Sequence, residues 1–419
     1  RGNVTQTTYV PKSGSGLSNI VSTTAFASTC SNFVTCNQPQ SETDGRGFRT
    51  DFAYDATHGG VTSVTSPAPT GSTPVGSGTR PQTRFTYAQH TARYYTAPGT
   101  LSAGSPVWML TSISACATGA SCAGTSDETL TTIDYPSASV ANNLEVVSTS
   151  SGAGDASLTS AIAYAYDAVG NLVAMDGPLA GGVDTTTYRY DATRQLIGIS
   201  GPDPDGAGGL KHRAWRLVRN SDGQITSFEQ GTVDHQSSGG WSTFVSLLQL
   251  TSGYDFAGRL VRRERTANGS THLVQQVSYD NANRLECVTL RMNPSAFNSL
   301  PSSACSFSVT GNYGPDRMLR FQYNNADQTI RAISGAGTAA SLDEWSATYT
   351  PNGRMSTLAD ANSNLTTFVY DGFDRMREVR FPNVSGGGSS ASDFERYTYD
   401  ASSNVVQVRR RDGTTIVPT

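Results

Sequence analysis

Lysine, charge and long hydrophobic runs are scarce in this sequence of 419 residues. Lys12 and Lys211 are the only lysines, and charged residues make up 15% of the chain, with a formal net charge of −4. The longest apolar run, around Phe244–Leu250, is too short to cross a bilayer. Basic and acidic side chains are interspersed, which indicates neither a nucleic-acid partner nor a charged tail. We attribute the excess of arginine over lysine to a GC-rich genome rather than to a function.

Motifs for catalysis and cofactor binding are also lacking. The sequence has no C-x-x-C, no G-x-S-x-G and no H-E-x-x-H, and its five histidines are scattered. Gly335 to Ala340 has the glycine spacing of a dinucleotide loop, but the strand-like residues that follow cannot supply the helix N-terminus that holds pyrophosphate. Asp360, Asn362 and Asn364 resemble the start of a calcium loop without its later glycine and glutamate. We expect no cofactor, no metal and no enzyme, although carboxylates paired across strands leave a glycosidase open.

The six cysteines form three pairs of near neighbours in the sequence. An even count in local pairs favours disulfides that staple loops, and it favours an oxidising compartment. Zinc binding is the competing interpretation, but no histidine lies beside any pair. Free thiols are the third interpretation. Proximity along the chain predicts the disulfides Cys30 with Cys36, Cys116 with Cys122, and Cys287 with Cys305.

A short Tyr-Asp phrase is the most informative feature that is present. Glycine (42) and proline (18) punctuate the chain, as is typical of many short strands joined by turns. The phrase follows alternating Thr and aromatic residues and precedes a turn and an apolar pair. It occurs at Tyr54-Asp55, Tyr166-Asp167, Tyr190-Asp191, Tyr254-Asp255, Tyr279-Asp280, Tyr370-Asp371 and Tyr399-Asp400. Degenerate copies begin at Arg219-Asn220, Tyr323-Asn324 and Tyr349-Thr350. Such recurrence indicates one supersecondary unit used repeatedly.

Each copy of the phrase predicts a β-hairpin. In TTTYRYDATRQLIGIS, alternating residues form a strand, Asp191 lies where the chain reverses, and Leu196 opens the return strand. A short acidic side chain accepts hydrogen bonds from backbone N–H groups two or three residues further on. Gly170, Gly258 and Asn283 occupy the turn position expected to need positive φ. Because a lone hairpin is marginal in water, we predict an all-β fold in which consecutive hairpins pair into one long curling antiparallel sheet.

The phrases YAYDAVGNLVAMDGP, YRYDATRQLIGISGPDPDG, YDFAGRL and TTFVYDGFDRM resemble the Rhs/YD-repeat proteins of bacteria. That family also includes the shells of Tc-type insecticidal toxin components and the extracellular barrel of teneurins. The pattern covers most of the chain from Tyr166 to Asp400, and it is thinner from Arg1 to Asp55. The resemblance implies a strip of sheet that spirals around a cavity and, in polymorphic toxins, encloses a C-terminal toxic domain. It also implies a secreted bacterial protein, extracellular or at the cell surface.

The domain organisation is expected to be a single array over residues 1–419, with degenerate repeats and inserted loops over 1–160 and regular repeats over 161–419. The chain begins inside a repeat and ends soon after one, which suggests a piece of a longer protein. Rhs shells commonly close with a core region that is cut at an Asp-Pro motif. Here the only Asp-Pro, Asp203-Pro204, lies mid-chain. We interpret it as a structural turn rather than a cleavage site or a calcium loop through Asp203 and Asp205.

Two classes of function remain from the sequence. The first is a structural or encapsulating shell segment, whose partner is its own C-terminal cargo or further repeats of the same chain. The second is a surface adhesin or a self-assembling extracellular protein that joins copies through edge strands. The 18 tyrosines and four tryptophans could bind glycans, but cross-strand packing in the sheet explains them as well. No nucleic-acid partner and no membrane span are expected.

Overall fold

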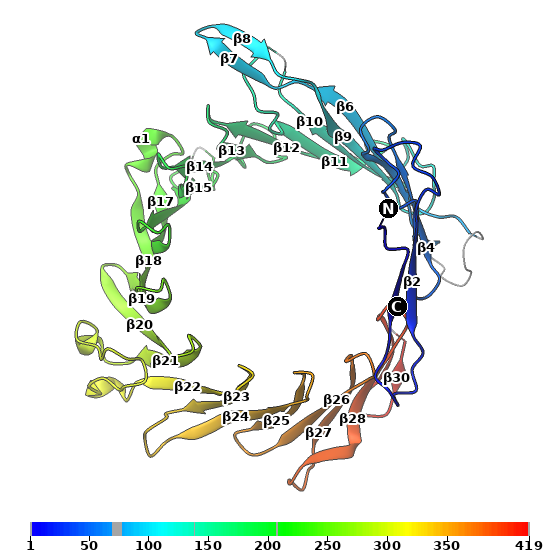
Figure 1. Cartoon of the computed structure of the whole chain (residues 1–419). Helices are drawn as coiled ribbons and strands as arrows, with labels where there is room; N and C mark the ends of the chain where they lie inside the picture. Colours follow the sequence, from blue (N-terminus) through cyan, green and yellow to red (C-terminus); the bar gives the residue numbers. More distant parts are fainter. Residues whose placement is uncertain (1, 69–77, 138, 207, 418–419) are drawn as a thin grey trace. The chain divides into compact units, whose positions relative to one another are not determined.

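The computed structural model describes residues 2–68, 78–137, 139–206 and 208–417 and divides into two compact units. Unit 1 consists of Arg1–Pro11, Leu17–Gln195 and Gly201–Gly208. Unit 2 consists of Lys12–Gly16, Leu196–Ser200 and Gly209–Thr419. Figure 1 shows strands that follow one another in chain order within each unit. Whether the whole chain is one array stays a prediction.

Unit 1 is a ladder of antiparallel strands in which each strand pairs with the next along the chain, with one exception. The exception is β6, which pairs with β9 and leaves β7 and β8 as a separate two-stranded hairpin. In Figure 1 this hairpin extends beyond the ends of β6 and β9. The strands are β1 (Gln6–Tyr9), β2 (Ile20–Ala25), β3 (Ser41–Thr43), β4 (Arg49–Tyr54), β5 (Val61–Thr65), β6 (Gln82–His90), β7 (Arg93–Ala97), β8 (Thr100–Ala103), β9 (Val107–Cys116), β10 (Glu128–Asp134), β11 (Ser148–Ala153), β12 (Thr159–Tyr166), β13 (Leu172–Asp176) and β14 (Thr186–Tyr190).

Unit 2 continues the same pattern, and each of its strands pairs with the next. Its strands are β15 (Leu196–Ser200), β16 (His212–Arg219), β17 (Ile225–Val233), β18 (Val245–Tyr254), β19 (Leu260–Ala267), β20 (Ser270–Tyr279), β21 (Leu285–Arg291), β22 (Arg317–Tyr323), β23 (Thr329–Ser334), β24 (Leu342–Tyr349), β25 (Met355–Asp360), β26 (Leu365–Tyr370), β27 (Met376–Pro382), β28 (Ser389–Tyr399), β29 (Val405–Arg409) and β30 (Thr415–Ile416). Its helices are short: α1 (Ser238–Trp241), η1 (Pro294–Ala296) and η2 (Gly311–Tyr313). The predicted all-β fold of consecutive antiparallel hairpins is confirmed.

A β-bulge stands immediately before the tyrosine of the repeat phrase. The register between β20 and β21 shifts between Ser278 and Tyr279, and that between β28 and β29 shifts between Thr398 and Tyr399. The same shift precedes Tyr54, Tyr166, Tyr254, Tyr323, Tyr349 and Tyr370. A bulge bends its strand and increases the local twist. The repeat therefore fixes a bend at the same point of successive hairpins.

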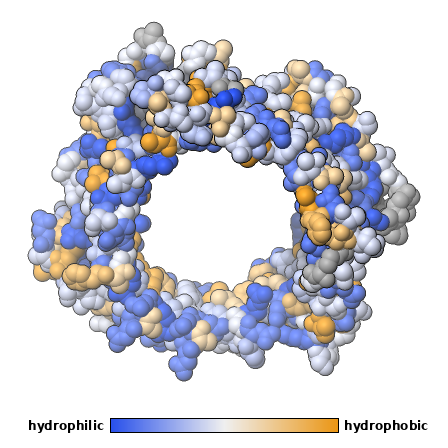
Figure 2. Space-filling model, turned by 45° about the horizontal axis from the view of Figure 1, so that its top comes forward, coloured by the Kyte–Doolittle hydropathy of each residue, from blue (hydrophilic) through white to orange (hydrophobic). Residues whose placement is uncertain are grey.

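Few side chains are fully buried, because little packs against the faces of the sheet. The accessible surface is 23870 Å², whereas a compact monomer of this mass has about 15,500 Å². A small buried cluster consists of Cys287, Ala304 and Met318. Figure 2 shows hydrophobic residues singly or in small groups among hydrophilic ones. Hydrogen bonds and ion pairs along the strands must therefore supply much of the stability that packing against a second layer of structure would otherwise give.

No helix among the described residues is long and apolar enough to span a membrane.

Candidate functional site: a clamp between successive repeats

The repeat turn is built around the side chain of its aspartate. Asp280 follows β20, and its Oδ1 accepts hydrogen bonds from the backbone N–H groups of Ala282 and Arg284, each at 2.9 Å. Its own backbone N–H donates to the carbonyl of Arg284. Asn324 closes the corresponding turn of a degenerate repeat through Oδ1 as well. The geometry needs an oxygen acceptor on a short side chain, which Asp and Asn both supply.

The third residue after the turn aspartate has positive φ. Gly170 and Gly258 have φ of 84° and 75°, and Asn283 has φ of 63°, as the sequence predicts. This region is easily reached by glycine and costs other residues energy. In several copies the residue at this position is neither glycine nor asparagine, and it still has positive φ. These residues are Arg194, Asp327, Asp374 and Ser403.

The first intact copy departs from this geometry. In the turn after Tyr54, the N–H of Asp55 donates to the carbonyl of Gly60, five residues on, instead of four. Oδ1 of Asp55 accepts from the N–H groups of Thr57 and His58 at 2.7 and 3.1 Å. The ring of His58 stacks on Trp108 with centroids 4.7 Å apart. This longer turn thus presents a histidine ring that packs on a side chain of β9.

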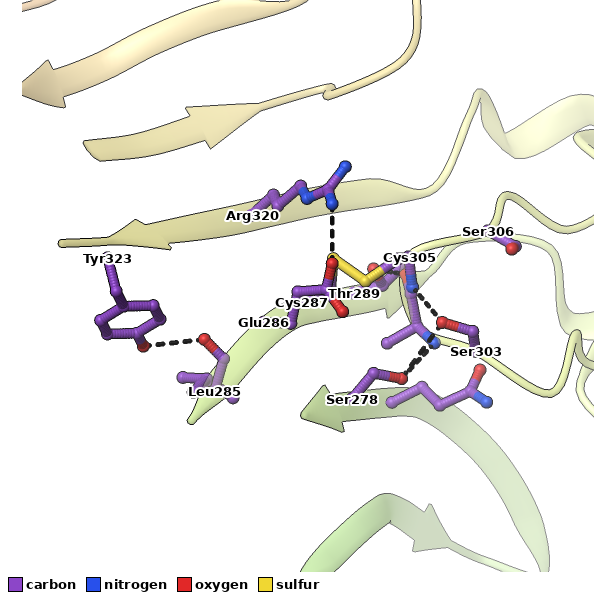
Figure 3. The surroundings of a disulfide bond; sticks show 12 residues. Ser278, Leu285, Glu286, Cys287, Thr289, Ser303, Cys305, Ser306, Arg320 and Tyr323 are labelled. Atoms are coloured by element: carbon purple, nitrogen blue, oxygen red, sulfur yellow. Dashed lines mark hydrogen bonds and ion pairs between the residues drawn. A yellow bond between two sulfur atoms is a disulfide. The ribbon is translucent and has the colours of Figure 1, made fainter. Parts of the chain in front are cut away.

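In unit 2 the tyrosine hydroxyl joins one hairpin to the previous one in six copies. Tyr279, at the end of β20, donates from its hydroxyl to the carbonyl of Leu260, the first residue of β19, at 3.0 Å. Figure 3 shows the equivalent bond from Tyr323 to the carbonyl of Leu285, at 2.8 Å. The same bond joins Tyr254 to Ile225, Tyr349 to Thr329, Tyr370 to Met355 and Tyr399 to Met376. Each acceptor is the fifth residue after the preceding turn Asp, Asn or Thr, so one rule sets the contact.

An arginine strengthens this contact in three copies. Arg259, four residues after Asp255, donates from Nε to its Oδ2 at 2.8 Å. Its guanidinium carbon lies 4.5 Å from the ring centroid of Tyr279, within cation–π range. Its Nη1 also donates to Oδ1 of Asn283 in the next turn, at 2.6 Å. Arg284 and Arg375 repeat this arrangement over Tyr323 and Tyr399.

We call this set the inter-repeat clamp: the turn Asp, Asn or Thr, the tyrosine of the next repeat with its carbonyl acceptor and, in three copies, the arginine that bonds the turn aspartate. In unit 2 these turns follow β16, β18, β20, β22, β24, β26 and β28. Antiparallel strands reverse direction at each step, so these turns lie along the same edge of the sheet. The clamps therefore form a series along that edge.

Electrostatics keep the clamp in its hydrogen-bonding form. The Arg259 side chain, with backbone N–H donors, lowers the pKa of Asp255 below its usual value. The N–H of Arg284, followed by its side chain, lowers the pKa of Asp280. Burial raises the pKa of the Tyr399 hydroxyl, so that it stays a donor. Carboxylate acceptors and phenol donors thus persist together over a wide pH range.

The structure pairs the cysteines in the three predicted combinations. Cys30 is bonded to Cys36, Cys116 to Cys122 and Cys287 to Cys305. The third disulfide lies between β21 and the loop that leads to β22, beside the clamp of Tyr323 (Figure 3). Two groups of potential metal ligands occur among the described residues, and each contains both sulfurs of a disulfide.

The same loop contains a buried ion pair. Arg291 and Asp316 have 0% and 2% of their side chains exposed, and Nη1 lies 2.8 Å from Oδ2. Arg291 also donates to Gln276 and to the carbonyls of Ser303 and Ser306. Burial would raise the pKa of Asp316, but hydrogen bonds from the N–H groups of Ser308 and Met292, the Ser308 hydroxyl and Arg291 lower it overall.

The other predicted motifs are turns. Asp360 accepts from the N–H groups of Asn362 and Asn364, each at 2.9 Å, as an ordinary repeat turn does. Gly335 begins a turn that leads into strand β24, as the sequence predicts. Asp203 accepts from the N–H groups of Asp205 and Gly206. These contacts explain the side chains without a ligand.

The sequence interpretation missed the arginine of the clamp. The signal was present, because YDFAGR, YDNANR and YDGFDR each carry arginine four residues after aspartate. The predicted Tyr-Asp residues do not converge on one centre; each pair serves its own turn.

One family model matches the chain. Residues 166–205 match the model described as RHS Repeat. They include the turns of Asp167 and Asp191, whose Oδ1 atoms accept from the N–H groups of Asn171 and Gln195, each at 2.9 Å. No curated protein sequence matches.

Solved structures with some similarity include toxin complexes. The complex of TcdB2 and TccC3 without its hypervariable C-terminal region is 11% identical, covers 93% of this chain and 21% of its own, and gives a TM-score of 0.36. The Tc holotoxin pore of Photorhabdus luminescens is 10% identical, covers 97% of this chain and 24% of its own, and gives 0.30. The chain thus spans about a fifth to a quarter of these proteins.

Proposed function

We propose that this chain, of which residues 166–205 match the RHS-repeat model, is a structural, non-catalytic segment of a secreted shell, and that the complete protein encloses or displays a C-terminal toxic domain. The observation that carries the proposal is the inter-repeat clamp. The residues that recur along the sequence are the ones that join one hairpin to the next. Their repetition links successive hairpins into one sheet.

The chemistry of the turn aspartates also supports a structural role. A general acid needs a pKa near the working pH. Hydrogen bonds lower the pKa values of Asp167, Asp255, Asp280 and Asp360 instead. These carboxylates are therefore ionised at neutral pH and occupied by backbone donors, which suits turn formation rather than proton transfer.

The proposed location is outside the cell. Three disulfides with sequence separations of 6, 6 and 18 residues staple local loops. Disulfides of this kind form and persist in oxidising compartments. Titration of thiols in protein purified from the native host would show no free thiol if the proposal is correct.

Protection of a cargo is the direct test. The complete gene product is purified, its intact mass is measured, and it is treated with a broad-specificity protease beside its C-terminal segment expressed alone. We expect the C-terminal segment to survive in the complete protein and to be digested alone. Equal digestion in both samples would contradict enclosure within a shell.

Self-association gives a different outcome in the same preparation. Filaments or concentration-dependent oligomers, seen by electron microscopy and sedimentation, together with an unprotected C-terminal segment, would favour a self-assembling surface protein. A monodisperse protein with a protected segment supports the shell.

A further inference from the structure

A cavity of about 450 Å³ lies in unit 1 where the β7–β8 hairpin leaves the ladder. Its walls come from three separate segments: the start of β7, residues around Asn143, and the end of β12 with its turn. This volume is within the range of small-ligand pockets. None of the repeat rules requires a cavity here, because the hairpin and the segment around Asn143 lie outside the Tyr-Asp phrases.

Arg93 offers an unused donor to this cavity. Its backbone is held by Asn142, whose carbonyl accepts at 3.1 Å and whose N–H donates to the Arg93 carbonyl at 2.9 Å. Its Nε is buried and has no hydrogen-bond partner within the described part of the chain. A buried donor left unpaired costs about 1–3 kcal/mol. This Nε is not exposed to the cavity as it stands, so the side chain would have to turn slightly for a ligand oxygen to reach it and remove that cost.

Glu145 places a fixed carboxylate in the same cavity. Its Oε2 accepts from the N–H of Asn143 at 3.0 Å and its Oε1 accepts from Nδ2 of Asn143 at 3.1 Å. Leu144, between them, has φ of 63°, a conformation uncommon for leucine. Unlike Asn283 or Ser403, Leu144 does not belong to a repeat turn. The loop thus accepts backbone strain while it presents this carboxylate.

Aromatic rings supply the apolar part of the cavity. Tyr94 and Tyr95 line it and are 52% and 60% exposed. Tyr164 and Tyr166 form part of the wall, and their hydroxyls are engaged by Thr149 and by the carbonyl of Val146. Exposed tyrosines give a rigid flat contact surface with a polar tip.

The combination selects one class of ligand. A singly charged ligand that is attracted by one of these two groups would be repelled by the other. A purely apolar molecule would desolvate both charges and supply no hydrogen bond to Arg93. Hydroxyl groups accept from a guanidinium and donate to a carboxylate, and a sugar ring also has an apolar face for tyrosine. Asp167, which also lines the cavity, is occupied by its turn N–H groups.

We propose that this cavity, at the base of the β7–β8 hairpin, binds an uncharged saccharide, with the tyrosine rings of its wall against the sugar and Arg93 and Glu145 on its hydroxyls. The proposal is independent of the shell function. It concerns a site on one unit and needs no cargo.

The test uses saturation-transfer difference NMR on the full chain. The probes are the methyl glycosides of glucose, galactose, mannose and N-acetylglucosamine, with N-acetylneuraminic acid as the charged comparison. We expect at least one neutral glycoside to bind in preference to the acid. Tyr94→Ala with Tyr95→Ala should weaken its affinity about tenfold, and Arg93→Gln should weaken it as well.

Tyr313→Ala is the matched control, because Tyr313 is 60% exposed and lies in unit 2, outside the cavity. It should bind as the native chain does, and circular dichroism should show all variants folded. If no neutral glycoside binds, if only the acid binds, or if the cavity variants bind as well as Tyr313→Ala, the proposal is wrong.

Discussion

The turn aspartate works through one oxygen atom that accepts two backbone N–H groups. This explains why asparagine replaces it at positions 220 and 324, and why Thr350, which accepts from the N–H of Arg354 at 3.1 Å, serves in a third copy. Charge adds a second contribution where arginine follows four residues later. The two contributions can be separated, because asparagine keeps the first and loses the second.

Acid should weaken the clamp of Asp280. Its folded-state pKa lies below the ordinary aspartate value, mainly because the Arg284 N–H and then the Arg284 side chain stabilise the carboxylate. Its contribution to stability is therefore complete above about pH 4, the pKa of aspartate in the unfolded chain, and is lost as pH falls through the pKa of Asp280 in the folded chain.

Asp280→Asn keeps the turn and loses the charge. We expect it to melt below the native chain at pH 7, and the gap in Tm to narrow below about pH 4. A gap that is constant from pH 7 to pH 2.5 would contradict this account.

At the scale of the element, each hairpin depends on the preceding one through a tyrosine hydroxyl. Tyr279→Phe removes the bond to the carbonyl of Leu260 and keeps the ring under Arg259. The expected loss is about 1 kcal/mol of unfolding free energy, measured by urea denaturation. Tyr313→Phe is the control, since that ring is 60% exposed and none of the hydrogen bonds described involves its hydroxyl. Equal stabilities of the two variants would show that the bond contributes nothing.

The buried ion pair of the β21–β22 loop should be far more sensitive than an exposed pair. Arg291→Met leaves Asp316 buried without its cation, which costs about 3–5 kcal/mol. The matched substitution Arg411→Met breaks an ion pair with Asp393 in which the arginine side chain is 54% exposed, and it should destabilise the protein much less. Denaturation of both variants gives the comparison. Similar losses would mean that burial does not set the value of the pair.

At the scale of the whole molecule, energy is spread over many neighbouring contacts rather than collected in one core. Repeats of this kind behave as a sum of local terms and nearest-neighbour terms. Tyr279→Phe and Tyr399→Phe act on separate clamps, so their losses should add within about 0.5 kcal/mol. Arg259→Met and Tyr279→Phe share one clamp, and their losses should not add. A double-mutant cycle in urea tests both statements, and strong coupling of the two distant tyrosines would contradict them.

The sequence predicted most of the repeat and little of what connects repeats. Alternation before Tyr190, the turn at Asp191 and the positive φ of Gly258 are local properties, so a short stretch of sequence contains them. The contact of Arg259 with Asn283 depends on how far apart two turns lie in the folded sheet. The cavity at Arg93 was not predicted, because its walls come from segments that share no repeated pattern.

The direct pairing of β6 with β9 has a consequence for how such a chain can change over time. The β7–β8 hairpin between them is an insertion, and the strands on either side of it pair directly without a change in the register of any other strand. Descendants could lengthen, replace or delete it while every neighbouring hairpin kept its old partners. This position is therefore a site where new binding surfaces can be inserted. A foreign peptide grafted there should be displayed while the rest of the sheet keeps its strand pairing.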